Sequence, residues 1–235
     1  MDKVALRSRI RARRRAAACP AAVASGDSAD TLSANTVGVS LTKNTLDWLA
    51  TLSGNHPGMV VCAYISTGYE PPTQELLRAC TAAGYIVHVP VCEPDFQLSW
   101  VRWHSAVELV RSAWAPVMEP LGARIPFEAL VAGTGAASSH NQLRAIIVPA
   151  LAVDAEGTRL GQGGGYYDRF LAGVSGVPLA AVIYDDEYLP AGALPYDSLD
   201  MPVHYALTPS AWIPLGAAHH STVDHSKDPI GGANG

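Results

Sequence analysis

The segment from Val148 to Arg169 constrains the fold of this chain more than any other part of its 235 residues. It begins as an apolar, strand-like run and continues into residues 159–169, which hold four glycines, two tyrosines, an aspartate and two arginines. An apolar strand, a glycine-rich loop and a helix in succession are typical of α/β proteins. Because the glycines at 161, 163, 164 and 165 lack Cβ atoms, backbone N–H groups can converge there on an anion. The free N–H groups of a helix starting at residue 166 favour the same anion.

This glycine-rich loop matches neither of the two common nucleotide-binding motifs. A Walker A loop ends in Gly-Lys-Ser/Thr, whereas this loop ends in Gly165-Tyr166-Tyr167. A dinucleotide fingerprint requires a third glycine where Tyr166 stands. The alternative is a merely flexible turn, but flexibility would not require Arg159, Asp168 and Arg169 around the glycines. The loop therefore predicts a phosphate site outside both motifs.

Composition limits the classes of function. With 49% hydrophobic and 16% charged residues, the chain predicts one α/β domain over residues 1–215, followed by a disordered tail at 216–235. The net charge of −5 argues against nucleic-acid binding. No apolar run reaches the roughly 20 residues of a membrane span, so we expect a soluble, cytoplasmic protein without membrane contact. The four cysteines lack CxxC spacing and read as reduced thiols, and the eight scattered histidines read as solvent-exposed.

Alternating strand and helix patterns predict the fold class. Two helices are expected first, over 2–17 and 40–53; residues 16–39 fit a helix, a loop or a second helix equally well. Strands are then expected at 59–66, 85–92, 98–103, 144–154 and 178–185, with helices at 73–84 and 166–173. Residues 115–143 read as a long irregular crossing. The pattern favours a single α/β domain with a mostly parallel sheet and helices on both faces.

Several patches together resemble a known family. The run Asp154-x-x-Gly157-x-Arg159-Leu160-Gly161-x-Gly163-x-Gly165-Tyr166-Tyr167-Asp168 is similar to the signature of 5-formyltetrahydrofolate cyclo-ligases, also called 5,10-methenyltetrahydrofolate synthetases. Three further patches occur in the family's order: Lys3 with Arg7, Tyr64-Ile65-Ser66 followed by Glu70 and Thr73, and Asp200-Met201-Pro202-Val203. The resemblance implies a three-layer fold of the ribose-phosphate isomerase/CoA transferase type.

The resemblance also implies a reaction and its site. ATP and Mg²⁺ would drive the conversion of 5-formyltetrahydrofolate to 5,10-methenyltetrahydrofolate through a phosphorylated formyl intermediate, with release of ADP and phosphate. Arg159 and Tyr166 are the expected catalytic residues. We expect the protein to be a monomer that binds its small-molecule substrate. The expected nucleotide-binding residues are Lys3, Arg7, Arg159, Gly161, Gln162, Gly163, Gly164, Gly165, Tyr166, Tyr167 and Arg169.

Charged side chains fit these roles. Lys3 and Arg7 are spaced i, i+4 and would share one helix face, whereas the later arginines of this helix read as a solvated basic surface. Asp168 and Asp200 are expected to hold Mg²⁺, which takes a few oxygen ligands plus water, with an N-cap or turn role as the alternative. Asp154 is expected to hold a turn rather than a ligand.

The substrate side is expected near Glu70, which follows a predicted parallel strand, where open α/β sheets bind ligands. Its carboxylate could accept from the amino and ring N–H groups of a pterin; the alternative is a cap on the next helix. The resemblance assigns folate contacts to Ile65 and Glu70, and Tyr166 and Trp114 are offered as aromatic contacts.

Gln162 and Gly164 depart from the family pattern. Members commonly have a larger aromatic or a basic residue at the first of these positions, and some have lysine at the second. Arg159, Arg169 and backbone donors must then compensate for the missing cations.

Two other classes of function remain open. One is a regulator that binds a nucleotide or sugar phosphate without turnover. The other is an RNA-associated protein that uses the arginine-rich helix, which the net acidity disfavours. RNA binding would weaken steeply with salt, which distinguishes it from the enzyme.

Overall fold

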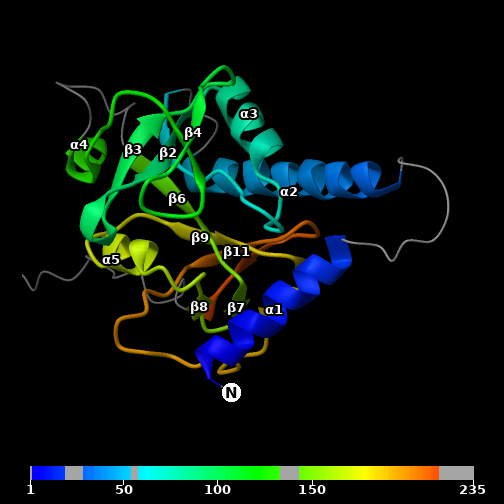
Figure 1. Ribbon diagram of the computed structural model, residues 1–235. Coiled ribbons are helices and arrows are strands. Elements are labelled where there is room, and N and C mark those ends of the chain that lie inside the picture. The colour runs from blue at the N-terminus through cyan, green and yellow to red at the C-terminus, as the bar shows by residue number, and fades with distance from the viewer. Residues whose placement is uncertain (1, 19–28, 54–57, 133–142, 217–235) are drawn as a thin grey trace, which may run out of the picture.

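A seven-stranded sheet forms the centre of the computed structural model, which describes residues 2–18, 29–53, 58–132 and 143–216 (Figure 1). Its strands are β1 (Val60–Cys62), β2 (Ile86–Cys92), β3 (Leu98–Arg102), β6 (Leu143–Pro149), β9 (Leu179–Val182), β11 (Tyr205–Leu207) and β12 (Trp212–Pro214). They lie in the order β12-β11-β9-β6-β1-β2-β3. Neighbouring strands are parallel except at the two edges, where β12 and β3 run antiparallel to β11 and β2. The prediction of a mostly parallel sheet is confirmed.

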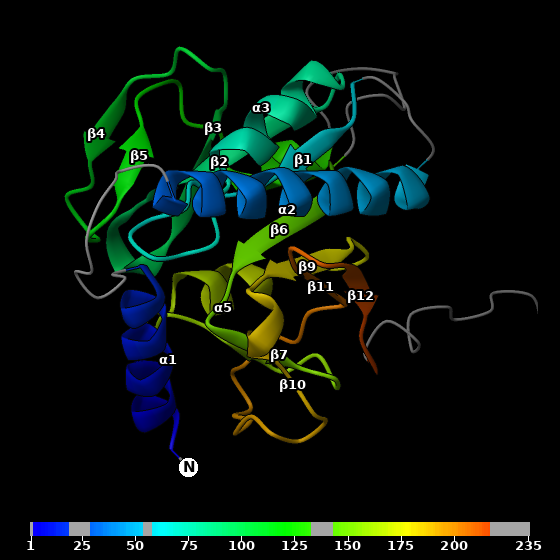
Figure 2. The ribbon, with the colours of Figure 1, turned by 90° about the vertical axis from the view of Figure 1, so that its right-hand side faces the viewer.

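Helices cover both faces of this sheet. The helices α2 (Ala29–Ser53) and α3 (Gln74–Ala82) pack on one face, against Val61 and Ile147. The helices α4 (Phe127–Ala132) and α5 (Tyr166–Leu171) pack on the other, against Val60 and Ile146. Figure 2 shows α2 and α3 above β9, β11 and α5. Because adjacent residues of each strand point to opposite cores, both must be apolar, and the result is the predicted three-layer arrangement.

The N-terminal helix α1 (Lys3–Ala18) packs on a second, three-stranded sheet. That sheet has the order β10-β7-β8 and consists of β10 (Tyr188–Leu189), β7 (Ala152–Asp154) and β8 (Arg159–Leu160). Leu6 and Ile10, one turn apart on α1, contact the cluster that contains Leu151 and Leu160. Because β8 leads directly into the glycine-rich loop, this packing brings α1 beside the loop.

Several predicted elements need correction. The run 144–154 was expected to be one strand, but it forms β6 and β7 in two different sheets. Both strands are buried, so no polar residue marks the break. The helix expected at 40–53 begins at Ala29. The crossing expected at 115–143 contains β5 (Met118–Pro120), which pairs with β4 (Leu109–Arg111), and α4.

The prediction that the histidines are solvent-exposed also fails at two positions. His204 is only partly exposed, and its Nδ1 accepts the N–H of Leu179 at 3.0 Å. His88 lies in β2, an interior strand covered on both faces, and is only 4% exposed. Cys62, Cys80 and Cys92 are free thiols, as predicted, and Cys19 lies outside the described residues.

The end of the described chain is fixed by a hydrogen bond. The N–H of Gly216 donates to the carbonyl of Ala155, so the first residue of the tail predicted at 216–235 is ordered. The rest of that tail, 217–235, lies outside the described residues. Within the part of the chain that the structure describes, no helix combines the length and apolar character needed to cross a membrane.

Candidate active site

The glycine-rich loop takes a path that depends on its glycines. It connects β8 to α5, and Gly163 and Gly165 have φ angles of 93° and 75°, in the left-handed region that other residues rarely adopt. A Cβ atom on Gly161 would lie 2.8 Å from the guanidinium of Arg159. Close approach and positive φ together explain why glycines recur in residues 161–165.

Lys3 and Arg7 both reach elements predicted to belong to the site. The Nε of Arg7 donates to the carbonyl of Gly161 at 2.9 Å. Lys3, one turn earlier, forms an ion pair with Asp200. The shared helix face predicted for these two cations therefore lies against both the glycine-rich loop and the Asp200 loop.

Arg159 is buried at the start of the loop. It is 5% exposed, forms an ion pair with Asp168 in the first turn of α5, and donates from Nη1 to the carbonyl of Pro149 at 3.3 Å. Its Cζ lies 6.0 Å from the ring centroid of Tyr167. Since a buried guanidinium requires a negative partner, the position of Arg159 depends on Asp168.

Glu70 connects the loop after β1 to the glycine-rich loop. Its Oε2 accepts the N–H of Thr67 at 2.9 Å, and its Oε1 accepts Nε2 of Gln162 at 3.0 Å. Arg11 donates in turn to the Gln162 side-chain oxygen at 2.9 Å and to its backbone carbonyl at 2.6 Å. The alternative role, a cap on α3, is not observed: Thr73 occupies the N-cap, and Glu70 bonds to Thr67 and Gln162 instead.

Aromatic residues gather around Tyr166. Its hydroxyl donates to the carbonyl of Trp114 at 3.3 Å, and its ring centroid lies 5.5 Å from that of Phe96. The guanidinium of Arg169 stacks over the Phe96 ring, with Cζ 4.6 Å from the ring centroid. Trp114 itself is 57% exposed. The predicted contacts Tyr166 and Trp114 thus lie together, although the indole of Trp114 is largely open to solvent.

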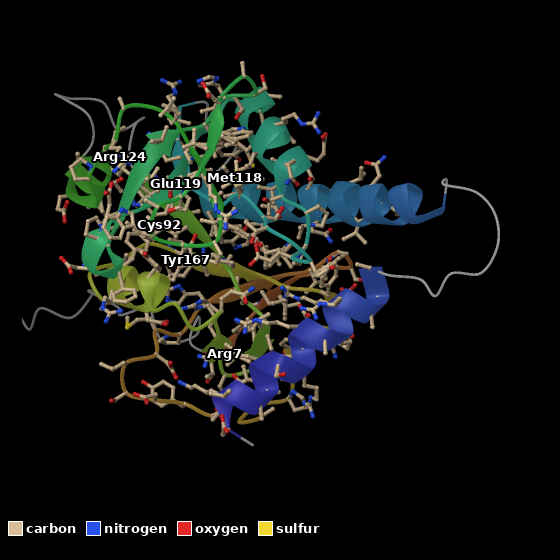
Figure 3. The ribbon with its side chains drawn as sticks, viewed as in Figure 1. Arg7, Cys92, Met118, Glu119, Arg124 and Tyr167 are labelled. Carbon is tan, nitrogen blue, oxygen red and sulfur yellow. The ribbon has the colours of Figure 1, made fainter. Side chains whose placement is uncertain are left out.

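Two hollows flank the loop after β1. The larger, of about 390 Å³, lies between Ile65 and Ser66 on one side and Val117 and Met118 of the β4–β5 hairpin on the other. The smaller, of about 160 Å³, lies between this loop and α1. Thr67 lines both hollows. Figure 3 shows Tyr167 between Met118 on the hairpin and Arg7 on the side of α1.

The two predicted magnesium ligands, Asp168 and Asp200, are both ion-paired. Their side chains are 34% and 16% exposed, so solvent reaches them. No three His, Cys, Asp or Glu side chains of residues 2–18, 29–53, 58–132 and 143–216 gather into a metal-binding group. Mg²⁺ at a phosphate site needs only one or two carboxylates besides water and phosphate oxygens, so this donor set fits it.

Asp154 has the structural role predicted for it. It is fully buried and accepts the N–H groups of Glu156, Thr158 and Leu194 at 3.2, 3.0 and 3.3 Å. All its bonds hold the turn between β7 and β8 and the nearby chain.

Burial keeps two tyrosines of the site protonated. It raises the pKa of Tyr64 and of Tyr167 well above the ordinary value, and the neighbouring Glu70 carboxylate raises both further. Neither hydroxyl is therefore a base near neutral pH.

Sequence reasoning missed several residues of this region. Arg14 was expected on a solvated surface, but it is 6% exposed and donates twice to Glu187, at 2.7 Å each. The helical spacing of these residues could have indicated this position, because Arg7, Arg11 and Arg14 lie on the same face of α1 as Lys3. Phe96 and Glu119 carried no such signal. The carboxylate of Glu119, 6% exposed, accepts the N–H of Cys92 at 3.1 Å and so ties the β4–β5 hairpin to β2 (Figure 3).

Comparisons with known proteins identify the family of this chain. The family model described as the 5-formyltetrahydrofolate cyclo-ligase family matches residues 1–209. A 5-formyltetrahydrofolate cyclo-ligase of Mycolicibacterium smegmatis is 33% identical over 172 residues, which cover 71% of this chain and 80% of that protein. The Escherichia coli K12 protein of the same name is 30% identical over 155 residues, 64% of this chain and 78% of that one.

Solved structures share the fold. The 5,10-methenyltetrahydrofolate synthetase of Aquifex aeolicus superposes with a TM-score of 0.61 at 25% identity, covering 92% of this chain and 93% of that one. The synthetase from Mycoplasma pneumoniae gives a TM-score of 0.56 at 16% identity, covering 88% and 98%. With the family match along nearly all of the described chain, the protein belongs to the 5-formyltetrahydrofolate cyclo-ligase family and is a ligase enzyme of folate one-carbon metabolism.

Proposed function

We propose that the protein uses ATP and Mg²⁺ to convert 5-formyltetrahydrofolate to 5,10-methenyltetrahydrofolate, releasing ADP and phosphate. The observation that carries this proposal is the convergence of distant patches at one site. Arg7 contacts the glycine-rich loop, Lys3 contacts Asp200, and Glu70 contacts Gln162. These contacts bring predicted nucleotide, metal and folate residues together beside α1 and the glycine-rich loop.

The chemical problem in this reaction is the formamide oxygen, a poor leaving group. In the proposed mechanism this oxygen attacks the γ-phosphorus of ATP, and the bond from phosphorus to ADP breaks. N10 then attacks the formyl carbon and loses its proton, and the oxygen leaves with the phosphate. The sequence of steps requires no side-chain nucleophile, so the protein contributes position and charge.

Each part of the site has a role in this mechanism. Lys3, Arg7 and the N–H groups of residues 161–165 hold the phosphates, and Arg159 stabilises negative charge during phosphoryl transfer. Asp168 and Asp200 would hold Mg²⁺, which would supply further positive charge next to the phosphates. These two carboxylates would exchange their present ion pairs for the metal.

The folate would occupy the larger hollow beside Ile65. Ile65 and the β4–β5 hairpin supply its apolar walls. Glu70 lines the neighbouring smaller hollow and would accept from the pterin amino and ring N–H groups beside Thr67, which lines both hollows. Tyr166 provides an aromatic face next to the formyl group. The monomeric state, the cytoplasmic location and the absence of nucleic-acid binding remain predictions from the sequence.

The test is the absorbance of the methenyl product. Purified protein is mixed with 5-formyltetrahydrofolate, Mg²⁺ and ATP, and each component is omitted in turn. We expect absorbance to rise only in the complete mixture and to be lost in the Asp168→Ala variant. Folded protein that binds ATP without producing absorbance would contradict the proposal and favour a nucleotide-binding regulator.

A further inference from the structure

The smaller hollow beside α1 is lined by three arginines to which the mechanism above assigns no role. It has a volume of about 160 Å³. The helix contributes Arg11, Arg14 and Arg15, and the loop after β1 contributes Thr67 and Tyr69. Three arginines lining one small hollow are unusual for a solvated helix surface, since like charges repel.

Arg14 has a buried nitrogen without an acceptor. Its Nε and Nη2 bind the two oxygens of Glu187, and Nη2 also donates to the carbonyl of Ala150 at 2.8 Å. Nη1 is buried and has no hydrogen-bond partner among the described residues. A buried donor left unpaired costs about 1–3 kcal/mol, so a ligand oxygen that reached Nη1 from the hollow would be stabilised.

The hollow also has an excess of positive charge. Glu187 neutralises Arg14, but Arg11 bonds only to the uncharged Gln162, and Arg15 has no acidic partner in the described part of the chain. The one carboxylate in the wall, that of Glu70, already accepts two N–H donors. Guanidinium groups with free N–H donors bind planar or tetrahedral oxyanions strongly.

We propose that this hollow is an oxyanion subsite, which holds a phosphate or a carboxylate group of one substrate. The proposal rests on the proposed function, because that function supplies two ligands with such groups. ATP carries phosphates, and 5-formyltetrahydrofolate ends in a glutamate with two carboxylates. The subsite lies one to two helix turns beyond the Lys3–Arg7 pair. It therefore binds a different group from the phosphates that this pair holds.

The test compares Arg15→Glu with Arg9→Glu. Both residues are exposed on α1 and both substitutions change the net charge equally, but Arg9 lines neither hollow. Calorimetry would measure the binding affinity of each variant for three ligands, without turnover. These are a non-hydrolysable ATP analogue with Mg²⁺, 5-formyltetrahydrofolate, and 5-formyltetrahydropteroate, which lacks the glutamate. We expect Arg15→Glu to weaken one ligand about tenfold more than Arg9→Glu does.

The pattern of losses identifies the group that is bound. A loss for the ATP analogue alone assigns the subsite to phosphate. A loss for 5-formyltetrahydrofolate but not for the pteroate assigns it to the glutamate carboxylates. Equal effects of the two substitutions on every ligand would overturn the subsite, whereas a wild-type protein that binds neither the ATP analogue nor the folate would contradict the proposed function itself.

Discussion

Lys3 and Asp200 form an ion pair that joins the first turn of α1 to the loop before β11, across 197 positions of sequence. The same oxygen of Asp200 accepts the N–H of Asp197 at 2.7 Å, which fixes the orientation of the carboxylate. A cation expected to bind nucleotide and a carboxylate expected to bind metal are thus in direct contact.

Replacing Lys3 should affect binding more than stability. We expect Lys3→Met to raise the KM for ATP about tenfold, as a charge-assisted contact to phosphate is lost. Because the pair is partly exposed, the free energy of unfolding should change by less than about 1 kcal/mol. Lys43→Met is the control, since Lys43 forms an exposed ion pair with Asp47 on α2. Equal effects of the two variants on the KM would argue against a nucleotide role for Lys3.

Asp168 should show separate metal and structural roles. Asp168→Asn keeps an oxygen that accepts from Arg159 but removes the charge, so we expect activity to fall about 10–100-fold with a raised Mg²⁺ requirement. Asp168→Ala also leaves the buried Arg159 without its partner and should lower the free energy of unfolding by about 1–3 kcal/mol. Activity against Mg²⁺ concentration and urea unfolding separate the two effects. An asparagine variant with the wild-type Mg²⁺ requirement would exclude the metal role.

Two neighbouring glycines should respond differently to alanine. Gly163 has a φ of 93°, and a Cβ there would lie 3.4 Å from the Arg7 guanidinium. We expect Gly163→Ala to cost about 1–2 kcal/mol of stability and to weaken ATP binding, because the loop must shift. Gly164 has no positive φ, and its added Cβ would come only within 3.4 Å of the Tyr166 ring, so Gly164→Ala is the matched control. Loss of ATP affinity in the control alone would contradict this account of the loop.

Much of the fold could be predicted because its signals are local. Apolar runs such as 85–92 and 178–185 located strands of the parallel sheet, and the glycine-rich loop located its helix. The break between β6 and β7 could not be seen, since residues 145–153, which span it, are apolar throughout. The pairing of β6 with β1 and β9 depends on contacts between distant segments, which no local pattern records.

The site residues that lie in sequence motifs could be predicted. The residues that only tertiary packing brings to the site were missed. Lys3, Glu70 and Asp200 lie in short patches whose residue types suggest their chemistry. Arg14 was assigned to solvent because its partner, Glu187, is 173 positions away in the sequence. Phe96 reaches Tyr166 only through a turn in which Asp95 and Phe96 both have positive φ, a conformation that these residue types do not predict.

The Arg14–Glu187 pair should be essential for docking α1. Glu187 is 1% exposed, so Glu187→Ala leaves a buried cation and should lower the free energy of unfolding by about 3–5 kcal/mol. Replacing both residues with apolar ones, Arg14→Met with Glu187→Leu, should restore most of this loss. Chemical denaturation measures both variants. A double variant no more stable than Glu187→Ala would contradict the explanation that the unpaired charge of Arg14 causes the loss.

His88 should make the protein sensitive to acid. Burial and, to a smaller extent, the nearby positive charge of Arg102 together lower its pKa to about 4. In the unfolded chain a histidine has a pKa near 6.5, so between these values the unfolded state binds a proton that the folded state excludes. The contribution of His88 is therefore complete above about pH 6.5 and is lost as the pH falls towards 4, amounting to about 3 kcal/mol.

Two asparagine variants test this dependence. Carboxylates also titrate in this range, so the informative quantity is the difference in slope between variants. Urea unfolding from pH 7 to pH 4 should give the steep wild-type slope for His104→Asn, since His104 is exposed. The slope for His88→Asn should be shallower by about the same 3 kcal/mol over the range, even if this variant is less stable at pH 7. Parallel slopes for the two variants would mean that His88 already takes up its proton in the folded protein, through water reaching β2.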